Sequence, residues 1–283
     1  MIWLLPLIIL LAYSIIGWTI YFIQPSLLYQ PKRTVLYDPS DIGLAFENVT
    51  LNSTAGCKLS AWFVPAVNAR LTVLLCHANA GNISHRLDTV KIFHDLGINC
   101  MLFDYQGYGL SQGSPTEQGT YDDARSAWNW LTRIKGIPEN SIILFGRSLG
   151  GCIAAQLASS VHPAGLVVES AFTSYIEIGK HYYPFMPVKL FAEYRYPTAD
   201  YIRRIDCPLL IMHSKADKVV PYEMGLKLHD IAHEPKEFAR IYGSHNEGFL
   251  HSGSRYIDIW DNWIRRIATS TPDVRPEQLR FIS

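Results

Sequence analysis

One stretch of this chain decides its fold, and it reads Ser141-Ile-Ile-Leu-Phe-Gly-Arg-Ser-Leu-Gly-Gly-Cys-Ile-Ala-Ala-Gln156. The apolar run before Gly146 is typical of a buried strand, and the run after Gly151 is typical of a helix. Glycines flank Ser148 because a chain that turns sharply from strand to helix has no room there for side chains. The stretch therefore predicts a strand, a tight turn and a helix, with Ser148 at the turn as a candidate nucleophile. The alternative is that Ser148 only caps the helix.

A serine hydroxyl is a weak nucleophile, so this hypothesis requires a base and an orienting acid later in the chain. Asp217 lies in a polar turn that follows a short apolar strand over 209–212 and ends at Pro221. His245 lies in a loop just after a half-buried strand that breaks at Gly243. We expect His245 to take the serine proton and Asp217 to fix the tautomer of that histidine.

Two other residues are alternatives for the acid and the base. Glu169 ends a strand and is the alternative acid, while His251 is the alternative base because it lies six positions after His245.

The negative oxygen of a tetrahedral intermediate requires backbone N–H donors. We expect these from Asn79, in the loop after the strand-like run 71–77, and from Leu149, which follows the nucleophile.

Four motifs together carry a family resemblance: His77-Ala-Asn-Ala-Gly-Asn82, Phe103-Asp-Tyr-Gln-Gly-Tyr-Gly-Leu-Ser111, Gly146-Arg-Ser-Leu-Gly-Gly151 and Ser244-His-Asn-Glu247. With them the chain resembles the serine hydrolases of the α/β-hydrolase fold over about residues 45–268. Within that fold it is similar to the membrane-anchored, small-lidded branch that includes protein depalmitoylases and related serine peptidase-like hydrolases. The resemblance implies Ser148, Asp217 and His245 as nucleophile, acid and base, and the amides of Asn79 and Leu149 as the oxyanion hole.

Strand-like and helix-like runs alternate along the chain, which predicts an α/β fold. We expect a mostly parallel sheet of about eight strands with helices on both faces and the site at the carboxyl ends of the strands. The tail, 269–283, is expected outside the core. The expected strands are 47–52, 59–65, 71–77, 98–104, 142–147, 165–169, 208–213 and 237–243, and the main helices 84–96, 121–135, 149–160, 222–232 and 255–268.

The N-terminal segment has the length and composition of a membrane span. No charged side chain occurs between Ile2 and Ile23, so residues 1–23 can cross a bilayer as one transmembrane helix. A cleaved signal peptide is the alternative, but the segment lacks a basic start and a small-residue cleavage site, and its apolar run is too long. Residues 24–44 are expected to be a juxtamembrane connector in which prolines block regular structure.

The membrane side of the domain is predicted from charges. Lys32 and Arg33 follow the span and no basic residue precedes it, which favours a cytoplasmic domain. Three glycosylation-type patterns, at Asn48, Asn52 and Asn82, argue for the opposite side. The five cysteines are an odd number without paired spacing, which again favours a reducing compartment.

An aromatic insert follows the strand that ends at Glu169. Residues 172–196 are rich in aromatic and apolar side chains, and placed over Ser148 they would line an entrance suited to an acyl chain. We single out Tyr182, Tyr183 and Phe185 as candidate substrate contacts. The alternative is that these rings only pack the insert onto the domain.

These features predict a membrane-anchored serine hydrolase that cleaves an ester or thioester of a small or acylated substrate through an acyl-enzyme on Ser148. A peptidase or amidase acting on small peptides and a non-catalytic binding protein of the same fold are the alternatives. A net charge of +0 argues against nucleic acid as a partner. No H-E-x-x-H or C-x-x-C pattern occurs, so we expect neither a metal nor an organic cofactor.

Overall fold

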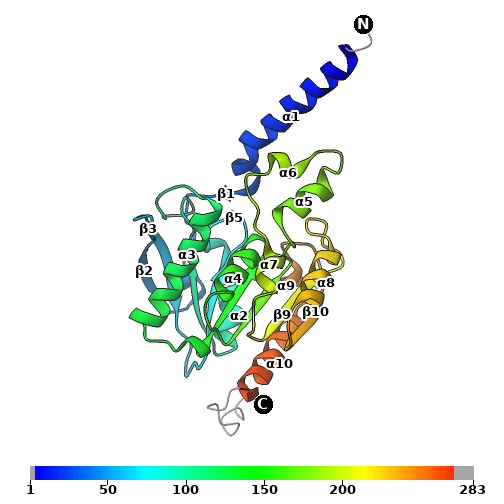
Figure 1. Ribbon diagram of the computed structural model, residues 1–283. Coiled ribbons are helices and arrows are strands. Elements are labelled where there is room, and N and C mark those ends of the chain that lie inside the picture. Colours follow the sequence, from blue (N-terminus) through cyan, green and yellow to red (C-terminus); the bar gives the residue numbers. More distant parts are fainter. Residues whose placement is uncertain (1–3, 271–283) are drawn as a thin grey trace.

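A twisted sheet with helices on both sides and one helix that projects from one end of the molecule make up the structure (Figure 1). The computed structural model describes residues 4–270. Of the expected C-terminal tail, residues 269 and 270 belong to helix α10 (Ser254–Ser270), and the remainder lies outside the described residues.

The central sheet has eight strands in the order β10-β9-β8-β7-β4-β6-β3-β2. Strands β4 and β6 to β10 run parallel, whereas β3 pairs antiparallel with both β2 and β6. The prediction of a mostly parallel sheet of about eight strands is confirmed. The strands are β2 (Glu47–Asn52), β3 (Lys58–Val64), β4 (Thr72–Cys76), β6 (Asn99–Phe103), β7 (Ile142–Arg147), β8 (Gly165–Glu169), β9 (Leu209–Ser214) and β10 (Lys236–Ile241).

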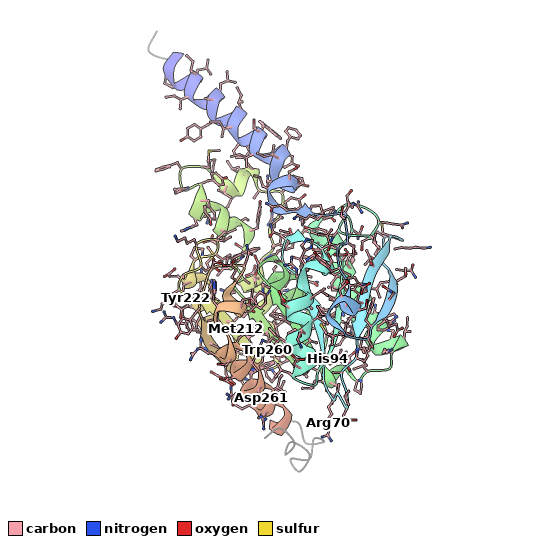
Figure 2. All side chains as sticks on the ribbon, turned by 180° about the vertical axis from the view of Figure 1, so that it is seen from behind. Arg70, His94, Met212, Tyr222, Trp260 and Asp261 are labelled. Atoms are coloured by element: carbon pink, nitrogen blue, oxygen red, sulfur yellow. The ribbon has the colours of Figure 1, made fainter. Side chains whose placement is uncertain are left out.

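Each central strand is buried on both faces, which explains its continuous apolar sequence. In β7, Leu144 packs into one core cluster, and Ile143 and Phe145 pack into the other. Helices α3 (Glu117–Asn129), α4 (Leu149–Ala158) and α8 (Tyr222–Ile231) cover the first face, and α2 (Leu87–Asp95) and α10 cover the second. Trp260 of α10 and Met212 of β9 belong to this second cluster and are labelled in the rear view of Figure 2.

The shorter elements gather mainly around the carboxyl ends of the parallel strands. The insert that follows β8 forms two helices, α5 and α6, which lie beside α1 at one end of the molecule (Figure 1). The shorter elements are β1 (Gln30–Pro31), β5 (Ala80–Gly81), α5 (Tyr175–Tyr182), α6 (Val188–Phe191), α7 (Thr198–Ile202), α9 (Gly248–His251), three 3-10 helices (Pro39–Ile42, Ile83–Arg86, Glu139–Ser141) and a π-helix (Trp130–Ile134).

The projecting helix, α1 (Leu4–Leu28), is longer than the sequence predicted. It continues through Pro25, although prolines were expected to end regular structure after residue 23. Proline cannot donate to the carbonyl four residues earlier, which is that of Tyr21, and the side-chain amide of Gln24 lies 3.5 Å from this oxygen instead. Beyond the helix, β1 pairs with β5, so the connector begins with ordered structure.

Helix α1 has the length and apolar composition to cross a membrane over residues 6–28. Its apolar side chains are nearly all exposed there, unlike those of a core helix. No other helix in the described part of the chain is as long and apolar. The helix thus has the features of a membrane anchor, which an N-terminal signal sequence shares.

Candidate active site

Ser148 lies at the sharp turn between β7 and α4. Its backbone has a φ of +55°, which is strained for a residue other than glycine. A Cβ atom on Gly146 would overlap the carbonyl of Gly150, and one on Gly150 would overlap the carbonyl of Cys76. Among the described residues the Ser148 side chain makes no capping hydrogen bond to α4. The turn therefore presents the hydroxyl instead of using it as a helix cap.

The structure brings Ser148, Asp217 and His245 together from three strand ends. The Nε2 atom of His245 lies 3.0 Å from the hydroxyl oxygen of Ser148, and its Nδ1 atom lies 2.7 Å from Oδ2 of Asp217. Ser148 and His245 are each only 7% exposed. A nucleophile, a base and an orienting carboxylate in a Ser-His-Asp arrangement would make such contacts, so these three residues form the candidate active site.

The carboxylate of Asp217 is held in its charged form. Oδ1 accepts hydrogen bonds of 2.8 Å from the amides of Val219 and Val220, and Oδ2 also lies 3.4 Å from Nε2 of His213. Burial alone would raise the pKa of Asp217, but the hydrogen bonds from His213 and His245 outweigh it and hold this pKa well below its usual value. A charged acceptor keeps the proton of His245 on Nδ1, which leaves Nε2 free to accept from Ser148.

Neither competing residue reaches the site. The Glu169 carboxylate accepts hydrogen bonds from Nε of Arg147 at 2.7 Å and from the Tyr256 hydroxyl at 2.6 Å, in a buried cluster behind the turn. His251 is exposed on α9, 3.9 Å from a carboxylate oxygen of Glu247. The contacts of Arg147 and Tyr256 were not predicted, because the cluster joins residues far apart in the sequence.

The two amides expected to form the oxyanion hole both border the pocket that contains Ser148. Among the described residues, neither the N–H of Asn79 nor that of Leu149 donates a hydrogen bond within the protein. Leu149 is the first residue of α4, where backbone N–H groups are unpaired. Asn79 is held by the end of α1, by β1 and by the core: its side-chain amide donates to the carbonyl of Leu28 at 2.9 Å, and its carbonyl accepts from the amide of Gln30 at 3.0 Å and from the hydroxyl of Tyr108 at 2.6 Å.

A buried histidine supports the loop that carries Asn79. His77 lies 2.7 Å from the carbonyl of Ala78 through Nδ1, and its ring centroid is 4.4 Å from that of Tyr105. Burial lowers the pKa of His77 to about 3, so this side chain is neutral near pH 7. Burial also raises the pKa of the adjacent Asp104 to about 7, although that carboxylate accepts from the amide of Ile83. The pair lies beneath the loop, away from the pocket.

A pocket of about 530 Å³ opens over Ser148 and His245. Tyr182 and Tyr183 line this pocket, whereas Phe185 is not among its lining residues. Phe185 follows the end of α5 at the tip of the insert and is 86% exposed. The lining includes Ile20, Gln24, Leu27, Leu28, Gln30, Asn79, Leu149, Phe172, Tyr175, Ile178, Met186, Val188, Phe191, Val219, Val220 and Asn246.

The contribution of α1 to this pocket was not predicted. Its signal in the sequence is the spacing of Ile20, Gln24, Leu27 and Leu28, which places these four side chains on one helix face. No group of three or more histidine, cysteine, aspartate or glutamate side chains that could hold a metal ion occurs within residues 4–270.

Comparisons with known proteins assign the family. Residues 67–196 match the family described as serine aminopeptidase, S33. The α/β-hydrolase domain-containing protein WAV2 of Arabidopsis thaliana is 30% identical over 285 residues, covering 90% of each chain. This chain belongs to the α/β-hydrolase family.

This α/β-hydrolase is also similar to two further relatives and to a solved structure. Protein Rv2307c of Mycobacterium tuberculosis is 34% identical over 94% of this chain and 95% of its own. The lysophosphatidylserine lipase ABHD12 of Macaca fascicularis is 31% identical over 64% of this chain and 50% of its own. The solved structure of the esterase Pf2001 of Pyrococcus furiosus superposes with a TM-score of 0.71 at 20% identity, over 84% of this chain and 98% of that chain, and so shares the fold. The protein is therefore a hydrolase, as predicted.

Proposed function

We propose that this hydrolase is a membrane-anchored serine hydrolase that cleaves the carboxylic ester or thioester of a lipid-like or acylated substrate. The observation that carries the proposal is the hydrogen-bonded chain from Asp217 through His245 to Ser148, which lies at the base of an apolar pocket. The arrangement supplies a nucleophile, a base and an orienting acid within hydrogen-bond distance of one another.

The reaction follows from this geometry. As the hydroxyl oxygen of Ser148 attacks the substrate carbonyl carbon, Nε2 of His245 takes the hydroxyl proton, and the amides of Asn79 and Leu149 donate to the negative oxygen. The protonated His245 then gives its proton to the leaving alcohol or thiol, and an acyl-enzyme remains on Ser148. Water, deprotonated by His245, attacks this ester. His245 then returns the proton to the oxygen of Ser148, which releases the carboxylic acid and restores the serine hydroxyl.

The pocket favours an uncharged acyl chain as its occupant. Within the described residues its lining holds no aspartate, glutamate, lysine or arginine, and most of its side chains are aliphatic or aromatic. Such a surface binds a hydrocarbon chain by burying it. The relative ABHD12 is a lipase by name, which agrees with a lipid-like substrate.

A peptidase is the second candidate because the matched family is described as serine aminopeptidase. An aminopeptidase must bind a free α-ammonium group, and a buried positive charge requires a carboxylate partner. The described lining of the pocket offers none. We therefore rank ester and thioester cleavage above peptide cleavage.

We assign α1 as an uncleaved anchor and place the catalytic domain on the cytoplasmic side. The anchor assignment is supported by the contacts of the last turns of α1 with the pocket and with Asn79, which a cleaved signal peptide would not provide. The cytoplasmic side is favoured by Lys32 and Arg33, the basic residues that follow the helix.

The test is labelling of the detergent-solubilised full chain with a fluorophosphonate probe, together with turnover of p-nitrophenyl esters, acyl thioesters and aminoacyl p-nitroanilides. Ser148→Ala should abolish both labelling and ester turnover. The matched control, Ser159→Ala, removes a hydroxyl at the other end of the same helix and should leave both intact. Failure of the folded wild type to label would favour a non-catalytic binding protein. Faster turnover of the anilides than of the esters would favour the peptidase.

A further inference from the structure

One face of α1 continues from the exposed part of the helix into the active-site pocket. Ile20, Gln24, Leu27 and Leu28 follow the spacing of one helix face, and all four line the pocket that contains Ser148. With a rise of 1.5 Å per residue, the wall from Ile20 to Leu28 is about 12 Å long. The helix therefore forms part of the cavity in which we place the substrate.

Gln24 fixes this wall to the insert. Its side chain is only 3% exposed, and its Nε2 atom donates to the carbonyl of Phe191 at 2.6 Å. Its Oε1 atom accepts from the amide of Glu193 at 3.0 Å. A buried amide whose donor and acceptor are both satisfied specifies one arrangement of the two segments. The far wall of the pocket, carried by the insert, is thus held at a defined position against α1.

Phe191 lies at the boundary between two cavities. It lines the active-site pocket and also an apolar groove of about 600 Å³ between α1 and the insert. Its ring packs directly on Gly17, where an added Cβ would overlap it, and lies edge-on to Trp18 with 6.5 Å between ring centroids. The groove is lined by Pro6, Ile9, Leu10, Tyr13, Ser14, Pro187, Leu190 and Phe191.

We infer that Phe191 closes the far end of an acyl-chain site whose wall is Ile20, Gln24, Leu27 and Leu28, and so sets the length of acyl chain that the enzyme accepts. This inference rests on the proposed function. In this arrangement the acyl chain of the substrate extends from Ser148 along α1 and ends at the ring of Phe191. Beyond the ring, the groove continues along the same face of the helix, so a smaller side chain at position 191 joins the two cavities.

The experiment measures kcat/KM of the full chain in detergent micelles for p-nitrophenyl esters from acetyl through octanoyl to palmitoyl. Phe191→Ala should raise the ratio of palmitoyl to octanoyl turnover by at least about tenfold, which is the gain expected if the opened site accepts one further methylene. Ile20→Trp, which fills the wall, should lower the ratio of octanoyl to acetyl turnover by a similar factor. Phe22→Ala removes the same ring from a side chain of α1 that is 73% exposed and outside the lining, and it should leave the profile unchanged.

Acetyl ester turnover serves as the readout of a folded, working Ser148 in each variant. If Phe191→Ala loses it, Phe191→Leu and Ile20→Trp decide the question, with a smaller shift expected for Phe191→Leu. The variants that keep acetyl turnover are compared with the wild type by the dependence of kcat/KM on acyl-chain length. The same dependence in these variants as in the wild type would overturn the inference and leave the proposed function intact. Absence of Ser148-dependent turnover in the wild type would overturn both.

Discussion

Replacing the carboxylate of Asp217 by an amide tests the proposed chemistry most directly. The Asp217→Asn side chain is almost the same size, and its remaining oxygen can still accept from the amides of Val219 and Val220. What changes is the partner of His245: an amide NH₂ at 2.7 Å favours the imidazole tautomer with its proton on Nε2. That proton faces Ser148, so the histidine can no longer accept the serine proton.

The expected loss can be worked out in two ways. A unit negative charge 2.7 Å from the imidazolium that forms during the reaction stabilises it by about 6 kcal/mol at an effective dielectric constant of about 20. At 1.36 kcal/mol per factor of ten, this energy corresponds to a rate change of about 10⁴-fold. The tautomer argument gives about the same factor in Ser-His-Asp enzymes. We therefore expect kcat for an acetyl ester to fall by about 10⁴-fold.

The assay compares kcat of the purified wild type, Asp217→Asn and Glu247→Gln. Glu247 lies two residues after His245, and its carboxylate is exposed, so the same chemical change there should alter kcat by less than about twofold. Thermal unfolding shows whether each variant is folded. A folded Asp217→Asn protein that keeps more than about a tenth of the wild-type kcat would refute the role of Asp217, because both estimates require a far larger loss.

Three further predictions concern stability and location. Glu169→Gln removes the charge that pairs with buried Arg147 and should lower the free energy of unfolding by about 3–5 kcal/mol. Asp200→Asn, in an exposed pair with Arg203, should change the free energy of unfolding by less than about 1 kcal/mol. Equal losses for Glu169→Gln and Asp200→Asn in denaturant titrations would contradict the argument from burial. Burial raises the pKa of Asp104 to about 7, whereas an unfolded aspartate titrates at about 4, so stability is lost as pH rises through the folded pKa. The Tm of Asp104→Asn should thus rise relative to that of the wild type as pH increases from about 4 to about 7, and a difference that stays constant over this range would argue against the shift. The protein should resist alkaline extraction from membranes and keep its N-terminal helix by intact mass, and a mass lacking the helix would show a cleaved signal peptide.

Much of this protein could be predicted from the sequence because the signals are local. The turn at Ser148 requires glycines two positions away on either side, and the structure shows that a side chain at Gly146 or Gly150 would overlap backbone. The central strands of the sheet are short apolar runs between turn residues, a pattern typical of strands buried on both faces. Asp217 and His245 could be found because parallel strands bring their carboxyl ends to one edge of the sheet.

The tertiary structure alone decided what depends on contacts between distant segments. Glu169 is the last residue of one buried strand and Asp217 follows another. Only their partners, Arg147 for Glu169 and His245 for Asp217, separate a structural carboxylate from a candidate catalytic one. Phe185 has an aromatic side chain of the kind that lines apolar pockets, yet it is exposed to solvent at the tip of the insert. Sequence periodicity reports which face of an element is apolar, but it does not report which distant segment that face meets. The contact of Gln24 with the insert, across 167 residues of chain, is of this second kind, and it makes the N-terminal helix a wall of the candidate active site.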